Sequence, residues 1–469
     1  MSEAREPLRR VVVAGDGQVG VLAALAVKRA LPSCDVAVLS TPPDPASFAD
    51  RAGTALPFSN RLHARLGSAE EDIVRSAGGS YRLVTRLIGW GADGQAGCLA
   101  YGMVDGAAPG EDFGRRWGGG SRSDAASASP GSLAELLAAN GRFAVPPDVA
   151  PSPLQGVDYA MRWNPGAYRE LLVARAQAAG VQYVSAGLAD AERAGSGIAT
   201  LVLGDGARLE ADLFLDCTGP GALLASRLDA FEREDWSAHL PTRHVGFAQP
   251  GEPLLALEDR VQLTENGFVA QSAGRDALHV LQGFFGDAAP EGCVPLVPGA
   301  LAQGWIGNVV AIGDAAAQFE PLGDFHLDLA HRQIDLVLEL LPGRAIEPLE
   351  RAEYNRRARL MADRVRDTLG LFYAAPRAVA MLGELKRSDV LVRWLDQYQR
   401  RSRLPFAEEA PLLTGELRSL MTALGFSGGS GALGRAQQAG GDDFARRADA
   451  ALRATPPYAE WLRSVVQSA

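Results

Sequence analysis

The chain has 469 residues, 47% of them hydrophobic, and a formal net charge of −10 at pH 7. A chain of this length can bury a large core and is expected to hold more than one lobe. The negative charge and the lack of a long basic run argue against nucleic acid as the main ligand, since phosphate binding needs clustered Lys and Arg. No apolar stretch is long enough to span a bilayer, and residues 1–10 are too charged for a signal peptide, so we expect a cytoplasmic protein without a membrane segment.

The four cysteines have neither the spacing of a metal site nor that of a disulfide framework; they are Cys34, Cys98, Cys217 and Cys293. We interpret each as a small buried hydrophobic side chain. The sequence therefore predicts no metal site.

The first predicted elements are a strand at residues 11–14 and a helix that opens with GDGQVG, residues 15–20. Gly15 permits a tight turn, Gly17 lets the backbone approach a pyrophosphate, and Gly20 lets the helix pack on the strand. The positive end of the helix would face the phosphates. This segment predicts a dinucleotide-binding site.

The next strand, at residues 35–39, departs from that fingerprint at its end. Dinucleotide-binding proteins usually place Asp or Glu there to bind the adenosine ribose, and this chain has Ser40. We expect either weaker cofactor binding or a ribose contact made elsewhere.

Two short helices at 60–66 and 69–77 and a strand at 81–88 are predicted next. Residues 101–155 are rich in Gly, Ala, Ser and Pro, and only 132–140 has a clear helical pattern. We interpret this stretch as an insertion or lid.

A helix is predicted at 164–179, because Asn164 is a good N-cap and Pro165 suits the first helical position. Strand-like segments lead from it to residues 211–219, an apolar strand that ends on Gly219. Residues 245–285 then alternate like an antiparallel sheet, which we interpret as the floor of a substrate lobe.

The segment NVVAIGDAAAQFEPL, residues 308–322, is the most informative about function. A buried strand at 309–312 delivers Gly313 and Asp314 to the start of a predicted helix, where Asp314 could accept a hydrogen bond from a ribose hydroxyl. Taken alone, this pattern is more often an ordinary strand-to-helix turn with an aspartate cap. Together with the glycine fingerprint and the strand that ends on Gly219, however, the segment favours a single FAD-binding domain over three unrelated turns.

Helices at 326–341 and 350–374 follow, and residues 380–469 look helical apart from the glycine-rich 425–434. The elements predict an α/β fold: a Rossmann-like, GR2-type FAD-binding domain with an inserted antiparallel-sheet substrate lobe and a helical C-terminal part.

We place the FAD-binding domain and its interleaved lobe at residues 1–379 and the helical C-terminal region at 380–469. Within the first part, the insertion lies at about 101–155 and the sheet of the lobe at about 245–285.

Most of the chain resembles the flavin-dependent tryptophan halogenases, in order and with similar spacing. The matching segments are the fingerprint at 15–20, AGTALP at 52–57 for the strap that faces the flavin, YAMRWN at 159–164, residues 209–219, WIGN at 305–308 leading into EPL at 320–322, YNR at 354–356 with FY at 372–373, and YAEWL at 458–462.

The resemblance implies FAD as the cofactor, reduced by a separate reductase, and a small aromatic substrate. No second dinucleotide fingerprint is visible, which also favours a separate reductase. A homodimer is possible on the same grounds. The predicted FAD contacts are Gly15, Gly17, Gly20, Thr54, Ala55, Gly219, Gly313, Asp314 and Pro321.

In such halogenases, hypohalous acid formed from chloride reaches a lysine beside the bound indole, and a glutamate takes the ring proton. This chain has Arg82 at the lysine position, and Arg stays protonated and cannot form a haloamine in the same way. Gly323 replaces the glutamate, and Asp324 and Phe325 follow it where small polar residues frame the chloride site. The family's Trp-x-Trp-x-Ile-Pro signature aligns with residues 267–273, which lack both tryptophans and the proline.

We therefore predict an FAD-dependent oxidoreductase of halogenase-like architecture that carries out a monooxygenase-type reaction on an aromatic or indolic molecule. Arg82 could anchor a carboxylate or an oxygen at the flavin, and Asp324 or His326 could handle protons nearby. Equally, Arg82 could be a strand-end arginine paired with an acidic neighbour, and His326 a helix-start histidine with its hydrogen bonds satisfied.

Two further classes stay open. One is a true halogenase with a rewired site. The other is a non-catalytic paralogue that binds flavin, or nothing, and acts as the partner of an active enzyme.

Overall fold

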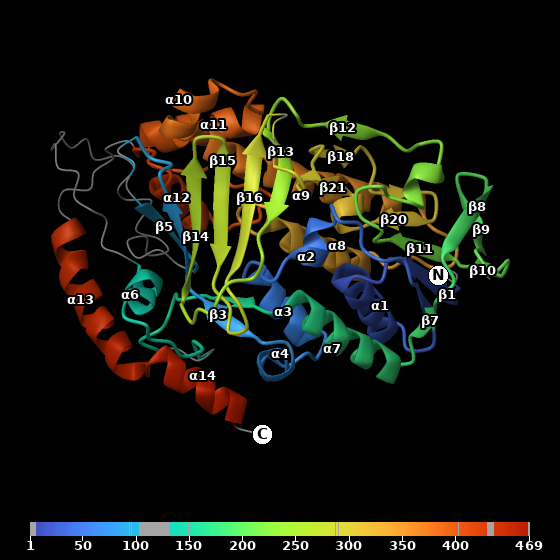
Figure 1. The fold of residues 1–469 in the computed structure, drawn as a ribbon, viewed down its shortest axis with the longest axis horizontal. Helices are drawn as coiled ribbons and strands as arrows, with labels where there is room; N and C mark the ends of the chain where they lie inside the picture. The colour runs from blue at the N-terminus through green and yellow to red at the C-terminus, as the bar shows by residue number, and fades with distance from the viewer. Residues whose placement is uncertain are drawn as a thin grey trace, which may run out of the picture. The chain divides into compact units, whose positions relative to one another are not determined.

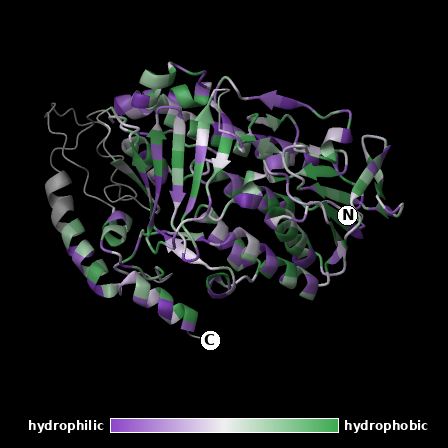
Figure 2. Ribbon diagram, viewed as in Figure 1, coloured by the Kyte–Doolittle hydropathy of each residue, from purple (hydrophilic) through white to green (hydrophobic). Residues whose placement is uncertain are grey.

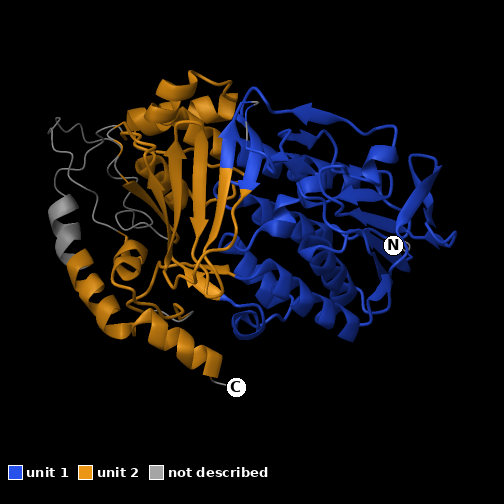
Figure 3. Ribbon diagram, viewed as in Figure 1, with its two compact units in different colours: residues 1–79, 163–246, 283–366 blue, residues 80–162, 247–282, 367–469 orange. Residues whose placement is uncertain are grey.

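The computed structural model describes residues 6–92, 94, 96–102, 132–147, 151–286, 288, 290–401, 403–428 and 436–467, the last range without the side chains of 436–443. The chain divides into two compact units, each assembled from three segments (Figure 3). Unit 1 comprises residues 1–79, 163–246 and 283–366, and unit 2 comprises residues 80–162, 247–282 and 367–469. Residues 367–469 thus cluster with the sheet of unit 2.

Unit 1 is built on a six-stranded sheet with the order β19-β20-β11-β1-β2-β7 (Figure 1). The strands are β1 (Arg10–Ala14), β2 (Asp35–Leu39), β7 (Gln182–Val184), β11 (Leu213–Asp216), β19 (Trp305–Ile306) and β20 (Val309–Ala311). All neighbours pair in parallel except β19, which runs antiparallel to β20. This topology confirms the predicted Rossmann-like core.

The helix α1 (Gln18–Ala30) follows β1 and lies against β1, β2, α7 (Pro165–Ala178) and α8 (Phe325–Glu339). Its first ten residues are buried, and the ribbon there is mostly hydrophobic (Figure 2). A helix that is apolar on nearly all sides needs neighbours on nearly all sides, and the sheet and these two helices provide them.

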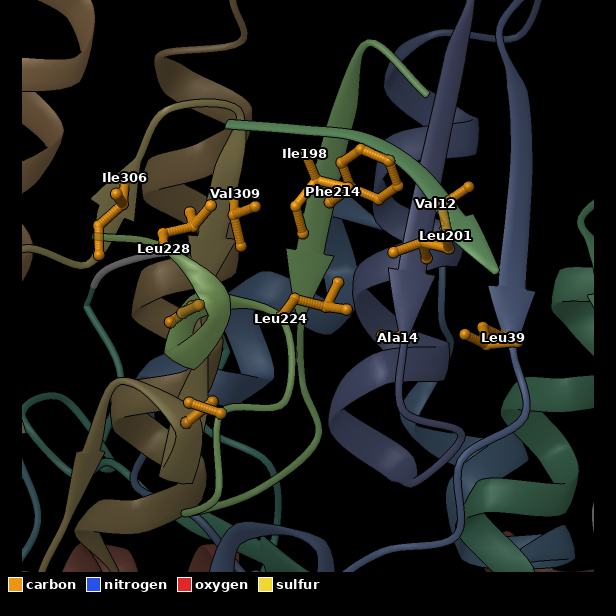
Figure 4. Close-up of a cluster of buried hydrophobic side chains, with 14 of the residues drawn as sticks. Val12, Ala14, Leu39, Ile198, Leu201, Phe214, Leu224, Leu228, Ile306 and Val309 are labelled. Carbon is orange, nitrogen blue, oxygen red and sulfur yellow. The ribbon is translucent and has the colours of Figure 1, made fainter. Parts of the chain in front are cut away.

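The core on one face of the parallel sheet includes alternate residues of its strands. Val12, Phe214 and Val309 belong to neighbouring strands of this sheet and pack with Leu201 of strand β9 (Gly197–Leu203) and with Leu224, which precedes the 3-10 turn at Ala225–Arg227 (Figure 4). Parallel strands buried on both faces read as continuous apolar runs, which is the pattern that β1, β11 and β20 have.

Unit 1 also contains α2 (Phe48–Arg51), α3 (Phe58–Arg65), α4 (Glu70–Ser76), α9 (Pro348–Ala374, which continues into unit 2), the 3-10 turns η1 (Ala225–Arg227) and η2 (Gly313–Ala315), and strands β8 (Leu188–Ala194), β9 (Gly197–Leu203), β10 (Arg208–Glu210), β12 (Arg233–Asp235), β13 (Thr242–Phe247), β17 (Val294–Pro295), β18 (Gly299–Leu301) and β21 (Ala317–Gln318). As predicted, Asn164 caps α7: its side chain accepts a hydrogen bond from the Ala167 amide at 3.0 Å.

The helix predicted directly after Gly313-Asp314 is wrong. The segment forms the short 3-10 turn η2, closed by a 3.0 Å hydrogen bond from the Ala316 amide to the Gly313 carbonyl, and continues into β21. The helix α8 begins only at Phe325. The chain does not continue as a helix, because Ala317 and Gln318 pair with Ala300 and Gly299 of β18.

Unit 2 holds a sheet with the order β16-β15-β14-β4-β5. The strands are β4 (Val84–Ile88), β5 (Ala96–Ala100), β14 (Glu258–Thr264), β15 (Gly267–Ser272) and β16 (His279–Phe285, whose end reaches unit 1). The antiparallel β14–β15 pair lies inside the predicted range of 245–285.

This sheet is mixed rather than purely antiparallel, because β4 pairs with β14 in parallel. The predicted strand at 81–88 is two strands: β3 (Ser80–Arg82) pairs with β6 (Ala160–Arg162), whereas β4 pairs with β14 and β5. Between them, the Leu83 amide donates to the Leu257 carbonyl at 2.9 Å, so the chain changes partners at this residue.

The helices of unit 2 are α6 (Leu133–Ala139), α10 (Pro376–Leu382), α11 (Asp389–Arg401), α12 (Thr414–Ala423), α13 (Ala436–Ala454) and α14 (Tyr458–Gln467). They confirm a helical C-terminal part and the one helix predicted within 101–155, which Ser132 caps through the Glu135 amide at 3.1 Å. The remainder of that predicted insertion lies mostly outside the described residues. No helix in the described ranges is long and apolar enough to cross a membrane.

Candidate functional site

The turn from β1 to α1 has room only for glycine at two of its three fingerprint positions. Gly15 has φ +109°, and a Cβ atom on it would lie 2.4 Å from the carbonyl oxygen of Cys217 at the end of β11. A Cβ atom on Gly20 would lie 2.1 Å from the Gly15 carbonyl oxygen. Both neighbours are backbone atoms, so the turn, the helix and β11 pack as the dinucleotide fingerprint requires.

The third glycine faces a carboxylate. A Cβ atom on Gly17 would lie 2.3 Å from a carboxylate oxygen of Asp50, and Asp50 Oδ1 accepts a hydrogen bond from the Val19 amide at 3.0 Å. Burial, and to a smaller extent the neighbouring Asp16, raise the pKa of Asp50 to about 6. The acidic side chain therefore lies at the helix N-terminus, the place where a pyrophosphate is expected.

The predicted strap is anchored from both sides within unit 1. The Trp163 amide donates to the Gly53 carbonyl at 2.7 Å, and the next two strap residues, Thr54 and Ala55, are buried. Gln18 Nε2 donates to the Ala52 carbonyl at 2.8 Å, while the Trp163 indole N–H donates to Gln18 Oε1 at 3.1 Å. Sequence reasoning missed Gln18; the signal was a lone polar side chain among the first ten residues of the helix.

Gly219 lies after β11 with φ +82°, and a Cβ atom on it would lie 2.1 Å from Ser47 Oγ. Before it, the buried Asp216 accepts hydrogen bonds from the Thr218 hydroxyl at 2.6 Å and from the Leu224 and Ala225 amides, both at 2.9 Å. Sequence reasoning missed the role of Asp216, which is to hold the turn where Gly219 sits.

Asp314 lies in η2, and Asp314 Oδ2 accepts a hydrogen bond from the Ala49 amide at 2.8 Å. Burial is the main cause, and the Asp50 carboxylate a further one, of a pKa raised to about 8. Asp314 Oδ1 is buried and has no hydrogen-bond partner in the described part of the chain. A buried carboxyl oxygen without a partner is uncommon, and a hydroxyl of a bound cofactor would satisfy it.

Pro321, Asp324 and His326 lead into α8. Pro321 is partly exposed, and Asp324 adopts the left-handed conformation, with φ +62°, as the residue before the first helical turn. The buried His326 donates from Nε2 to the Phe319 carbonyl at 2.8 Å and stacks on the Phe319 ring. Burial lowers the pKa of His326 to about 3, so the imidazole is neutral. This geometry favours the alternative role for His326, a satisfied helix-start histidine; its role in proton transfer stays a prediction.

Arg82 belongs to unit 2 and is fully buried. Its guanidinium donates to Asp259 Oδ2 at 3.0 Å and lies over the Tyr101 ring, 5.2 Å from the ring centroid. Arg162 donates to Asp259 Oδ1 at 2.9 Å, and the Ser272 hydroxyl also donates to Asp259. The pairing with Asp259 favours the alternative interpretation of Arg82 as a strand-end arginine paired with an acidic neighbour. A catalytic role for Arg82 stays a prediction.

A buried histidine pair beneath the strap had no sequence signal. His63 Nε2 lies 2.6 Å from the Tyr168 hydroxyl, and His331 Nδ1 lies 2.7 Å from the Ser59 hydroxyl. The two imidazole rings meet edge to face, with 5.6 Å between centroids. Burial lowers the pKa of His63 to about 4 and that of His331 well below its ordinary value, so both are neutral.

All nine predicted FAD contacts thus lie in unit 1, and Gly15, Gly219 and Gly313 follow the carboxyl ends of β1, β11 and β20. The glycine turn and the unpartnered Asp314 oxygen fit a dinucleotide, whereas the Asp50 carboxylate would have to move away from its phosphates. Among the described residues, no group of His, Cys, Asp or Glu side chains could hold a metal ion.

The family model described as "Tryptophan halogenase" matches residues 10–252 and 260–408. Among solved structures, the chain is similar to BrvH, a flavin-dependent halogenase from Brevundimonas sp. BAL3, at 23% identity, covering 98% of this chain and 99% of that one with a TM-score of 0.85. A flavin-dependent halogenase from Xanthomonas campestris is similar at 22% identity, with 98% and 99% coverage and a TM-score of 0.86. A tryptophan 6-halogenase from Streptomyces toxytricini is similar at 20% identity, with 97% and 100% coverage and a TM-score of 0.80. No curated protein sequence matches the chain. The family match and the shared fold confirm the resemblance that the ordered motifs indicate.

Proposed function

Because this chain belongs to the tryptophan halogenase family, whose members bind FAD, we propose that it uses reduced FAD and O2 to oxidise a small aromatic or indolic molecule in a monooxygenase-type reaction. Gly15, Gly17 and Gly20 would hold the FAD phosphates, and Asp314 would hold a hydroxyl of the cofactor. FAD supplies the redox chemistry when it is bound.

One observation carries this proposal: the side chain at the halogenase lysine position is paired inside unit 2. Arg82 donates to Asp259 at 3.0 Å and is fully buried. A guanidinium keeps its proton at all physiological pH values, so it cannot act as the lysine does in holding hypohalous acid. The loss of that step leaves the flavin and O2 chemistry without a halide carrier.

The segment before α8 supports the same conclusion from unit 1. Gly323 has φ +77°, and a Cβ atom on it would lie 2.5 Å from the Phe325 ring. A glutamate could not be accommodated here without moving Phe325, which is itself buried. Neither the carboxylate that would take a ring proton nor a small polar frame for chloride is present at these positions.

Enzymes of this family act on small aromatic substrates and receive reduced flavin from a separate reductase. We extend both properties to this chain. We also propose that it is cytoplasmic and forms a homodimer.

The test is an anaerobic titration of the purified protein with FAD and reduced FAD, followed by exposure to air with an aromatic substrate panel, with and without bromide. We expect oxygenated product at a rate that does not depend on bromide. Brominated product, with a rate that rises with bromide, would instead support a halogenase with a rewired site.

A second candidate function, a non-catalytic partner of an active enzyme, is favoured by the Asp50 carboxylate that faces Gly17. An acidic side chain at the pyrophosphate position opposes cofactor binding. If neither oxidised nor reduced FAD binds at micromolar concentration, this second candidate replaces the enzyme.

A further inference from the structure

A carboxylate lies at the end of β2, where the fingerprint normally provides an acidic residue. Asp16, the second residue of the GDGQVG segment, brings its side chain there from the β1–α1 turn. The Ser40 hydroxyl donates to Asp16 Oδ2 at 2.7 Å. The loss of the acid at position 40 is thus accompanied by an acid that reaches the same place from the neighbouring strand.

The backbone holds this arrangement. The Gly15 amide donates to the Leu39 carbonyl and the Asp16 amide to the Thr41 carbonyl, both at 3.2 Å. These two bonds tie the turn after β1 to the residues that follow β2. The backbone of Asp16 is therefore fixed next to the end of β2 by main-chain hydrogen bonds, and its carboxylate is held there by the Ser40 hydroxyl.

Arg169 of α7 completes the cluster. Its guanidinium donates to Asp16 Oδ2 at 3.0 Å and to the Asp16 carbonyl. The Asp16 side chain is 12% exposed and that of Arg169 is 35% exposed, so a ligand can reach them. Oδ2 accepts from both Ser40 and Arg169, while Oδ1 accepts no hydrogen bond from the described residues.

We propose that Asp16, oriented by Ser40 and Arg169, binds the adenosine ribose of FAD by accepting a hydrogen bond from a ribose hydroxyl. The proposal rests on FAD being bound at this fingerprint. In ordinary dinucleotide sites the acid at the end of β2 accepts from the ribose hydroxyl, and the adjacent β1–α1 turn meets the pyrophosphate. Here one turn provides both contacts.

The same three residues could instead form a phosphate site, because a guanidinium and a hydroxyl next to β2 suit a ribose 2′-phosphate. The Asp16 carboxylate argues against it. Asp16 already neutralises Arg169 at 3.0 Å, and its own charge would repel a phosphate dianion. The cluster therefore favours a free diol over a phosphorylated ribose.

The experiment measures binding of FAD, ADP, 2′-deoxy-ADP and 2′-phospho-ADP-ribose to the wild-type protein and to Asp16→Asn, by calorimetry and by competition with FAD fluorescence. We expect wild type to bind ADP about tenfold more tightly than 2′-deoxy-ADP, the value of one hydrogen bond to a charged group. Because a neutral amide oxygen accepts a hydrogen bond more weakly than a carboxylate does, the Asp16→Asn variant should show a several-fold smaller preference and bind FAD several-fold more weakly.

The direction of the second effect is diagnostic. Removing a negative charge beside a pyrophosphate should tighten binding if charge alone mattered, so weaker binding identifies a specific contact. Glu170→Gln is the matched control: Glu170 is exposed, neighbours Arg169 on α7 and lies outside the cluster, and it should leave all four affinities unchanged.

An unchanged preference for ADP over 2′-deoxy-ADP in Asp16→Asn, with the variant folded by circular dichroism, would overturn the inference. Tighter binding of 2′-phospho-ADP-ribose than of ADP would overturn it in favour of a phosphate site. These readouts use nucleotide binding alone, so a failure to find any oxidised product would contradict the proposed function and leave the ribose contact standing.

Discussion

The β1–α1 turn of unit 1 keeps the dinucleotide fingerprint, whereas the β3 strand of unit 2 departs from the halogenase pattern. In the turn, Gly15 and Gly20 each face a backbone atom that leaves no space for a side chain. In β3, Arg82 stands where the resemblance places the halogenase lysine, and the charge of Arg82 is paired with Asp259. A cofactor fold is maintained by many backbone contacts at once, whereas a reaction can be lost with one side chain. From this contrast we expect that a chain can keep the flavin-binding architecture of the family without its halogenase chemistry.

The largest effect is expected from Arg82→Ala. It would leave the buried Asp259 with Arg162 as its remaining ion-pair partner, and breaking a buried pair costs about 3–5 kcal/mol. Urea unfolding measures the loss. FAD affinity should not change, because all nine predicted FAD contacts lie in unit 1.

Arg260→Ala is the control for this prediction: Arg260 is exposed and pairs with Glu258 at 2.8 Å, and the loss of a surface ion pair costs only about 0–1 kcal/mol. If Arg82→Ala abolishes turnover while stability is unchanged, Arg82 has the catalytic role and the contrast between the two regions fails.

Gly20→Ala tests the other side of the comparison. A Cβ atom would lie 2.1 Å from the Gly15 carbonyl oxygen, so α1 would have to shift away from the turn. Such overpacking should cost about 2–3 kcal/mol and remove measurable FAD binding. Thermal unfolding and FAD titration are the measurements.

Gly187→Ala is matched to it, because a Cβ atom on Gly187 would have no neighbour within 4 Å. This second variant should bind FAD like the wild type. Normal FAD binding by Gly20→Ala would mean that the turn is not the nucleotide site.

The histidine pair predicts a stability that falls in acid. The pKa of His63 is lowered to about 4 in the folded protein, so protons bind the unfolded state preferentially. The stabilisation is fully present above the ordinary imidazole pKa of about 6.5 and is lost as pH falls toward 4, with about 2 kcal/mol lost by pH 5 from His63 alone.

Urea unfolding at pH 7.5, 6 and 5 measures this slope, and His63→Gln should make it shallower. A stability that is flat over this range would show that the pair is not buried as described.

The smallest effect concerns Asp50. Its pKa is raised to about 6, so the carboxylate is ionised above that pH and repels the cofactor phosphates. FAD affinity should rise by about tenfold between pH 7 and 5. Asp50→Asn should bind FAD at pH 7 as tightly as the wild type does at pH 5, with no pH dependence from this group.

The affinity changes for Asp50→Asn and Asp16→Asn should therefore have opposite signs, although each variant removes one negative charge from the same turn. Equal signs would contradict the separate roles given to the two carboxylates.

Much of the fold could be predicted from the sequence. The strand before GDGQVG, the helix capped by Asn164 and the helical C-terminal part depend on local patterns, so they were found. The helix expected after Asp314 was not, because Ala317 and Gln318 pair with β18, and a pairing between separate segments cannot be read from the local pattern. The partner change at Leu83 also escaped prediction, since pairing with Leu257 depends on residues far along the chain.

The candidate site could likewise be predicted only in part. The fingerprint glycines could be recognised from the sequence, because the turn that requires them is local. Asp50 at Gly17, Asp259 at Arg82 and the meeting of His63 with His331 have none, because each contact joins segments that only the tertiary structure brings together.

The interleaving of the two units also bears on how the protein is made. The strand β1 pairs with β11, and β11 with β20, so the sheet that carries the glycine turn stays incomplete until residue 311 has left the ribosome. By then most of the chain has been synthesised, including two segments that belong to unit 2. During translation β1 can pair early only with β2, so its other edge, which pairs with β11, stays open until residue 216 has been synthesised, and exposed strand edges are prone to aggregate. A nascent chain released at residue 250 should consequently depend on chaperones to stay in solution, whereas one extended past α8 should acquire the protease resistance of unit 1.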